Sequence, residues 1–194
     1  MTKDNIKREA LSLFVKKGYE GTSVSDIAKK ANIRASSIYF HYESKEQLFL
    51  SLFQDIVNEK LDYLEELRNK TADKGIKNLL QNYLDNHLKQ IETNRDRLVF
   101  YKRNAMFPPE NLKETTRKIL ISYEEEYVKL LTPAFHDGIR QGILKNEKIN
   151  KLLNAFQCVA DGLYVLSHYY EINIYKKIVD EVWDLFWKSI KSDN

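Results

Sequence analysis

Residues 22–45 constrain the fold of this chain more than any other segment. They read TSVSDIAKKANIRASSIYFHYESK, with Ser23 followed three residues later by Asp26. This spacing approximates a capping box, in which a hydroxyl and a carboxylate satisfy amide groups that a helix start would otherwise leave unpaired. The spacing therefore predicts that a helix begins near Val24. Basic side chains favour its end at Lys30, because cations stabilise the negative end of a helix dipole.

Only three residues, 31–33, separate this helix from the next one. Asn32 belongs to the few residue types other than glycine that tolerate the left-handed backbone conformation of a sharp turn. The second helix, predicted over residues 34–42, would bury Ile38 and Tyr42, which lie four residues apart on one face. Its other side chains are small, polar or aromatic and face outward. Two short helices in this arrangement are typical of helix-turn-helix proteins, whose second helix reads base edges in the major groove.

The segment together with its flanks, GYEGTSVSDIAKKANIRASSIYFHYESKEQLF, resembles the N-terminal region of the TetR family of bacterial transcriptional regulators. The resemblance covers the first quarter to third of the chain. The chain departs from the family pattern at Asn32 in the turn and at Ser36 early in the second helix, where the family usually has glycine. Both residues fit sterically, so the departures bear on the operator sequence and not on the fold.

The resemblance also implies which side chains contact DNA. Tyr39, His41 and Lys45 would contact phosphates, whereas Phe40 and residues 34–36 would lie nearest the bases. These residue types suit the two tasks, because hydroxyls and cations bind phosphates and the start of the second helix meets base edges. The residues predicted to contact DNA are Thr22, Ser23, Arg34, Ala35, Ser36, Ser37, Tyr39, Phe40, His41 and Lys45.

The composition favours an all-α protein. Only 6 glycines and 3 prolines occur among 194 residues, which leaves few turns and favours long helices over many short strands. The net charge of +3 does not by itself indicate DNA binding, but basic side chains outnumber acidic ones between residues 29 and 45. A single cysteine excludes an internal disulfide, and no apolar run approaches the length of a membrane span. Because the first residues lack the apolar stretch of a signal peptide, we expect a cytoplasmic protein with no membrane partner.

Helical periodicity divides the chain into two predicted domains. Residues 1–58 would form a three-helix, helix-turn-helix DNA-binding head, and residues 59–194 a helical ligand-binding and dimerisation bundle. A long helix from Ser44 to Lys70 would connect them. Pro133 is expected to kink a helix and not to end it, because apolar spacing resumes beyond it. Further helices are predicted over residues 76–91, 95–106, 112–131, 151–170 and 174–190.

The last two predicted helices are apolar on more than one side, which favours a homodimer. In the final helix, Ile174, Ile178 and Leu185 would face the core. A second stripe would then remain for a partner, and it consists of Val182, Trp183, Phe186, Trp187 and Ile190. A monomer would struggle to bury both stripes. The TetR resemblance implies an interface made by the last two helices of each subunit, and two-fold operators need two heads.

The bundle is rich in aromatic residues that suit a small-molecule pocket. Aromatic residues at helical spacing more often form a core, so it is the resemblance that favours a pocket. The tyrosine rings and Asp161 would suit an aromatic or cationic inducer, by stacking and by charge attraction. The residues predicted to line the pocket are Tyr83, His87, Phe100, Tyr101, Met106, Phe107, Tyr123, Tyr127, Phe156, Asp161, Tyr164 and His168.

An enzyme is a weaker interpretation of the same sequence. Cys158, Asp161 and His168 superficially resemble a thiol, carboxylate and imidazole set, but no phosphate loop, nucleophile elbow or paired metal motif accompanies them. The four histidines are scattered and no two lie at i, i+4 spacing. We therefore predict no catalytic residue, no metal site and no cofactor.

These observations favour a ligand-responsive repressor of the TetR type, a homodimer that a small molecule releases from a double-stranded DNA operator. Two alternatives stay open. One is a regulator that has no small-molecule inducer. The other is a helical small-molecule binding protein or enzyme whose head does not bind DNA.

Overall fold

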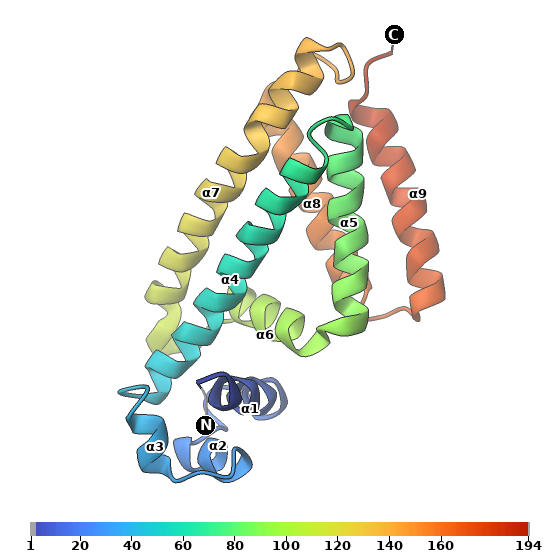
Figure 1. The fold of residues 1–194 in the computed structure, drawn as a ribbon. Helices are drawn as coiled ribbons and strands as arrows, with labels where there is room; N and C mark the ends of the chain where they lie inside the picture. Colours follow the sequence, from blue (N-terminus) through green and yellow to red (C-terminus); the bar gives the residue numbers. More distant parts are fainter. Residues whose placement is uncertain (1–2, 194) are drawn as a thin grey trace. The chain divides into compact units, whose positions relative to one another are not determined.

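The computed structural model describes residues 3–193, which fold almost entirely into helices (Figure 1). The only β-type pairing among these residues is an isolated antiparallel bridge between Leu144 and Lys191. The predicted all-α class is therefore confirmed. The helices are α1 (Lys3–Lys17), α2 (Val24–Lys30), α3 (Ala35–Tyr39), α4 (Lys45–Lys70), α5 (Gly75–Thr93), α6 (Arg95–Met106), the 3-10 turn η1 (Glu110–Leu112), α7 (Lys113–Arg140), α8 (Ile149–Leu166) and α9 (Ile172–Ile190).

The chain folds into two compact units. Unit 1 contains the residues up to Lys60 together with Asn94–Glu124, and unit 2 contains Leu61–Thr93 together with the residues from Glu125 onward. The helix-turn-helix segment thus shares its unit with α6 and the first part of α7. Both α4 and α7 contribute residues to each unit.

Aromatic rings form the centre of unit 1. Phe100 of α6 is 1% exposed, and its ring centroid lies 5.1 Å from that of Phe49 and 6.1 Å from that of Phe14. Phe53 adds a further edge contact to the same ring at 6.4 Å. α6 packs against α1, so it completes a core that the first four helices would otherwise leave open.

Two turns of unit 1 use the left-handed backbone conformation, as predicted for Asn32. Gly18, directly after α1, has φ of 75°, and Asn32 in the turn between α2 and α3 has φ of 55°, both in the left-handed region. Regular α3 ends at Tyr39, three residues earlier than predicted. The carbonyl of Ile38 accepts hydrogen bonds from the amides of both His41 and Tyr42, which tightens the chain into a turn. The predicted burial of Ile38 and Tyr42 is confirmed.

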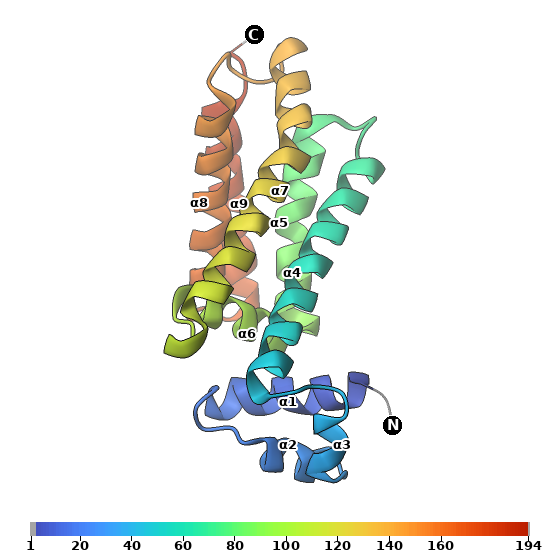
Figure 2. The same ribbon diagram turned by 90° about the vertical axis from the view of Figure 1, so that its left-hand side faces the viewer.

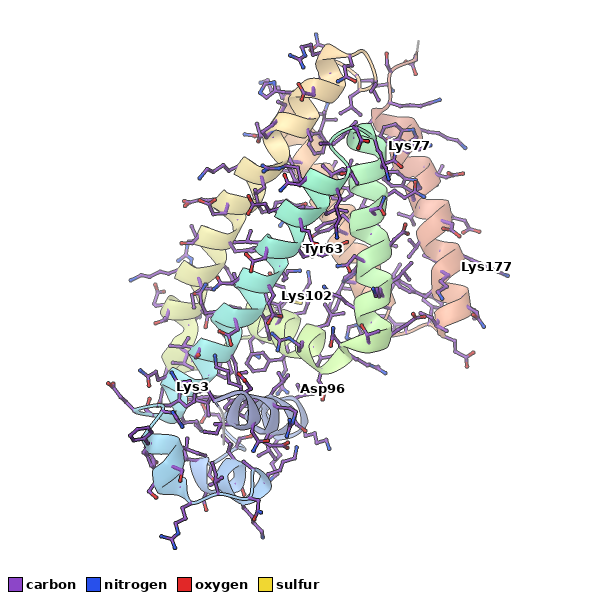
Figure 3. All side chains as sticks on the ribbon, viewed as in Figure 1. Lys3, Tyr63, Lys77, Asp96, Lys102 and Lys177 are labelled. Carbon is purple, nitrogen blue, oxygen red and sulfur yellow. The ribbon has the colours of Figure 1, made fainter. Side chains whose placement is uncertain are left out.

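Unit 2 is a helical bundle in which α8 and α9 run side by side, with α5 next to α9 (Figures 1 and 2). Tyr63 of α4 lies toward α5, and its hydroxyl donates to the carbonyl of Asn82 at 3.5 Å (Figure 3). α7 continues through Pro133 to Arg140, as expected of a proline that does not end its helix. None of the helices formed by residues 3–193 is long and apolar enough to span a bilayer.

The orientation of α9 differs from the prediction. Ile174 and Leu185, expected in the core, are 51% and 70% exposed, and Ile178 is half-buried. The residues that α9 buries in its own chain are Tyr175, Val179, Trp183, Phe186 and Ile190. The reason is area: a face that carries Trp183 and Phe186 removes more apolar surface from water than a face of isoleucine and leucine.

Candidate nucleic-acid interface

The start of α2 is fixed by a complete capping box. The hydroxyl of Ser23 accepts a hydrogen bond from the amide of Asp26 at 3.0 Å, and the Asp26 carboxylate accepts one from the amide of Ser23 at 3.2 Å. The main-chain hydrogen bond from Ser23, its hydroxyl and the charge of Lys17 lower the pKa of the Asp26 carboxyl. The carboxylate half of the cap is therefore fully present above the ordinary aspartate range and is lost as the pH falls through the lowered pKa, while the bond from the Asp26 amide to the Ser23 hydroxyl does not titrate. It holds α2 in place as the support for α3.

We expect Ser23→Ala to lower the free energy of unfolding by about 1 kcal/mol, because one amide at the helix start loses its acceptor. Urea denaturation at pH 7 measures the change. Ser25→Ala is the matched control, since Ser25 is one of the two serines that flank Val24 but lies inside α2. Equal effects of the two substitutions would contradict a capping role for Ser23.

The outward face of α3 carries most of the predicted DNA-contacting side chains. Phe40 is 85% exposed and Tyr39 is 54% exposed, although both are large and aromatic. Arg34 is the N-cap residue of α3, yet its side chain makes no capping hydrogen bond and lies exposed. His41 is half-buried, with its ring 5.1 Å from that of Phe40. Ser36 and Ser37 are exposed and Ala35 is half-buried on the same short helix.

Lys45, the first residue of α4, is held in one position by Tyr19. Its Nζ donates to the carbonyl oxygen of Tyr19 at 2.9 Å and lies 4.0 Å from the centroid of the Tyr19 ring. That ring is buried against Phe14 and Phe49, and its burial raises the pKa of Tyr19 to about 12. A lysine ammonium has three N–H donors, so two are left for a phosphate after the carbonyl has taken one.

Thr22 lies apart from this surface. It is 1% exposed, and its hydroxyl donates to the carbonyl of Gly18 at 2.8 Å. Its amide also bonds inward, to the carbonyl of Tyr19 at 3.3 Å. Thr22 thus shapes the turn before α2, in place of the side-chain contact to DNA that the sequence suggested. The hydroxyl of Ser23 is exposed but is engaged in the cap.

Basic side chains around α3 differ in how far their charge is compensated. Lys30 pairs with Glu9 at 3.2 Å and donates to Ser12. Lys29 and Arg34 form no ion pair in the part of the chain that the structure describes. Their uncompensated charge beside an exposed helix produces a local positive potential, which attracts a polyanion even when net charge is small.

The twelve residues predicted to line a ligand pocket are divided between the two units. Phe100 and Tyr101 are buried in unit 1, where Tyr101 stacks on Phe53 at 5.7 Å. Met106 and Phe107 are 60% and 74% exposed at the end of α6. Tyr123, also of unit 1, is half-buried with its ring 6.3 Å from that of Tyr101. These five residues belong to the core or the surface of unit 1.

The other seven lie in unit 2, mostly ring against ring. Tyr83 contacts the rings of Tyr127 and Phe156 at 6.1 Å and 5.6 Å. Burial raises the pKa of Tyr127 well above its ordinary value. Tyr164 has ring contacts with His87 at 5.5 Å and with His168 at 4.8 Å, and the exposed residues of the group are Asp161 and His168.

A cavity of about 230 Å³ lies elsewhere in unit 2. Its walls come from the end of α4, the start of α5, the stretch of α7 around Pro133 and Ile143. None of the twelve predicted ligand residues lines it. Sequence reasoning missed it because two stretches far apart in the chain form it, residues 68–79 and 133–143, and the only local signal is Pro133 inside a helix.

The set that superficially resembled a catalytic triad is not assembled as one. The ring nitrogens of His168 lie 3.3 Å from the hydroxyl and 3.2 Å from the carbonyl oxygen of Tyr164, and Cys158 is exposed on α8. Among residues 3–193, no three histidine, cysteine, aspartate or glutamate side chains gather as metal ligands.

Comparison with known proteins agrees with this geometry. Residues 6–52 match the family described as "Bacterial regulatory proteins, tetR family". The biofilm operon negative transcriptional regulator IcaR of Staphylococcus epidermidis is 39% identical over 79 residues, which cover 41% of this chain and 42% of IcaR. The transcriptional regulator YerO of Bacillus subtilis is 23% identical over 72% of this chain and 48% of its own length. The chain thus spans less than half the length of these curated relatives.

Similarity to solved structures extends over nearly the whole chain. The regulator FadR from Bacillus subtilis, solved in complex with stearoyl-CoA, has a TM-score of 0.74 at 18% identity and covers 95% of this chain and 97% of its own. A tetR-family regulator from Mesorhizobium loti has a TM-score of 0.75 at 17% identity and covers 97% and 96%. At such identities the likeness establishes the fold of both units.

Proposed function

We propose that this chain, whose residues 6–52 match the tetR family of bacterial regulatory proteins, is a DNA-binding transcriptional repressor, and not an enzyme, which a small molecule releases from its operator. The observation that carries the proposal is the exposure of side chains along α3 and its two caps, where Phe40 is 85% exposed and Arg34, Ser36 and Ser37 are exposed as well. A large aromatic side chain costs free energy in water, so its exposure on a supported helix favours a partner surface there. The protein acts in the cytoplasm, where bacterial operators are accessible.

α3 enters the major groove in this proposal. Residues 34–36 and Phe40 lie nearest the bases, where Arg34 can read a guanine edge and Phe40 can contact a thymine methyl group. Tyr39, His41 and Lys45 bind phosphates on either side. The fixed position of Lys45 on Tyr19 supports its role, because an ammonium already in place loses little entropy on binding.

A homodimer provides the two heads that a two-fold operator needs, with half-sites about 34–36 Å apart. The outer face of α8 and α9 supports this assembly. Val165 on α8 and Ile174 and Leu185 on α9 are exposed. No atom of the described residues lies within 4 Å of where a Cβ on Gly162 would be, so another helix can approach closely there. Burying these residues against a second copy of the chain removes an apolar surface that one chain leaves in water.

Control by a small molecule is supported by a neighbour and by a cavity. FadR from Bacillus subtilis was solved with a bound ligand, and unit 2 of this chain contains the cavity at the end of α4. α4 begins a few residues after α3, the second helix of the helix-turn-helix, and runs unbroken to Lys70. A ligand that favours one arrangement of α4 by 100-fold would supply about 2.7 kcal/mol of coupling to DNA binding.

Fluorescence anisotropy tests the proposal. The protein is titrated against DNA from upstream of its own coding region and against a shuffled duplex, at low and at physiological salt. We expect a preference for the upstream DNA that persists at physiological salt, since base contacts are less salt-sensitive than phosphate contacts. Binding to neither duplex at low salt would refute the DNA-binding proposal and favour a helical ligand-binding protein.

Lys45→Ala is expected to weaken binding to every duplex and to reduce the salt slope by about 2, because each subunit of a dimer loses one phosphate contact at roughly 0.9 per contact. Lys129→Ala is the matched control, since Lys129 is exposed and its one ion pair among residues 3–193 is with Glu126 on the same helix. The slope is measured as log Kd against log salt concentration. An unchanged slope in Lys45→Ala would show that Lys45 does not contact phosphate.

A further inference from the structure

We propose that the cavity at the end of α4 is a binding site for a small carboxylate with a compact apolar body. The inference rests on the proposed function for its regulatory meaning, but the site itself is argued from unit 2 alone. The predicted aromatic cluster around Tyr83 and Tyr127 is a separate part of the same unit.

The walls of the cavity are mainly apolar. Its apolar lining includes Ile76 and Leu79 of α5, Pro133 and Ala134 of α7, and Ile143. Its volume of about 230 Å³ equals that of about eight waters at roughly 30 Å³ each, below the range of drug-sized pockets. Such a space suits one ring or a short branched chain.

Two charged side chains line the cavity, and they differ in how far their charge is compensated. Asp137 already accepts a hydrogen bond from Nη2 of Arg140 at 2.6 Å. Among the residues that the structure describes, Arg68 forms one ion pair, with Glu65 at 3.8 Å, which is beyond hydrogen-bond distance. The guanidinium of Arg68 thus keeps its donors for a ligand, while the charge of Asp137 is offset within the protein.

One arginine among apolar lining residues favours a carboxylate. A guanidinium binds a carboxylate through two parallel hydrogen bonds, which an amide or an alcohol of equal size cannot reproduce. A dianionic phosphate would leave one charge uncompensated and would face Asp137, so the monoanion is favoured. A primary amine would have to compete with Arg140 for Asp137 and would be repelled by Arg68.

The site has a direct connection to α4. Arg68 and Asn69 belong to the last turn of that helix, and Gly75, with φ of 77°, opens α5 only a few residues later. A carboxylate held by Arg68 against the α7 wall would therefore fix the end of α4 and the turn that follows it. The ligand would then bind one arrangement of α4 more tightly than another, and α4 is the helix that follows α3 in the chain.

Benzoate, cyclohexanecarboxylate and isovalerate are the probes, with benzamide, benzylamine and phenyl phosphate as chemical controls. Binding to the full chain is measured without DNA, by thermal shift and by saturation-transfer NMR. We expect at least one carboxylate to raise Tm saturably and benzamide, benzylamine and phenyl phosphate to bind at least tenfold more weakly. Absence of binding by all three carboxylates at millimolar concentration, or stronger binding of the amine or the phosphate, would overturn the proposal.

Three variants locate the site. Arg68→Gln should weaken carboxylate binding at least tenfold, and Ala134→Phe should abolish it by filling the cavity. Arg117→Gln makes the same charge change on an exposed residue of unit 1 and should leave binding unchanged. Equal affinity in Arg68→Gln and wild type would refute the role of the guanidinium, whether or not the protein binds DNA. Conversely, if the anisotropy assay showed no DNA binding, the carboxylate-binding measurement would still test this site, because it uses no DNA.

Discussion

Replacing Phe100 by alanine is expected to lower the free energy of unfolding by about 3–5 kcal/mol, the range for deleting a buried phenyl ring. Phe100 is 1% exposed and contacts three other phenylalanine rings of unit 1. Its removal leaves a cavity between α6 and the helices that support α3. Urea denaturation followed by circular dichroism measures the change, and we expect weaker DNA binding where the variant is partly unfolded.

Phe107→Ala is the matched control, because it deletes the same ring seven residues further along. Phe107 is 74% exposed, so its loss should change the free energy of unfolding by less than about 0.5 kcal/mol. Both residues were predicted from the sequence to line a ligand pocket. A small effect of Phe100→Ala, comparable with that of Phe107→Ala, would contradict its place in the core of unit 1.

Leu185→Glu is expected to convert the proposed homodimer into a monomer and to weaken operator binding by 100-fold or more. Leu185 is 70% exposed on the outer face of α9. In a two-fold interface each copy would bring one glutamate into an apolar contact, where a buried unpaired charge costs several kcal/mol. A monomer presents one recognition helix and loses the joint binding of two half-sites.

Sedimentation velocity at micromolar concentration measures the assembly, and anisotropy on the same samples measures DNA binding. Thr115→Glu adds the same charge on an exposed part of α7 in unit 1, and it should remain dimeric. The monomer should keep its helical circular dichroism, because Leu185 makes little contribution to the core. If Leu185→Glu sedimented as the wild-type dimer, this face would not be the interface.

Short-range chemistry made the helix-turn-helix predictable. The capping box of Ser23 and Asp26, the left-handed Asn32 and the burial of Ile38 and Tyr42 each depend on residues within a few positions of one another. The continuation of α7 through Pro133 follows from local periodicity in the same way. Local preferences of this kind can be predicted from the sequence, because a hydrogen bond between near neighbours needs no other part of the fold.

The placement of distant segments could not be predicted in this way. The sequence marked Phe100 as aromatic and at helical spacing, but only the packing of α6 on α1 makes it part of the head. The face of α9 was wrongly assigned because both stripes are apolar and the choice depends on which neighbour is present. Thr22 was predicted at the DNA surface, and its hydroxyl turns inward only because the carbonyl of Gly18 lies within reach.

The sequence by itself determined the helical class, the helix-turn-helix segment and the resemblance to the TetR family, since these depend on local spacing and on a continuous motif. Only the tertiary structure decided that Tyr19 holds Lys45, that α6 belongs to the head, and that a cavity forms between the end of α4 and the stretch around Pro133. The physical reason is that a contact or a cavity between segments is a property of how their surfaces pack. Many sequences with the same local periodicity can pack their faces differently.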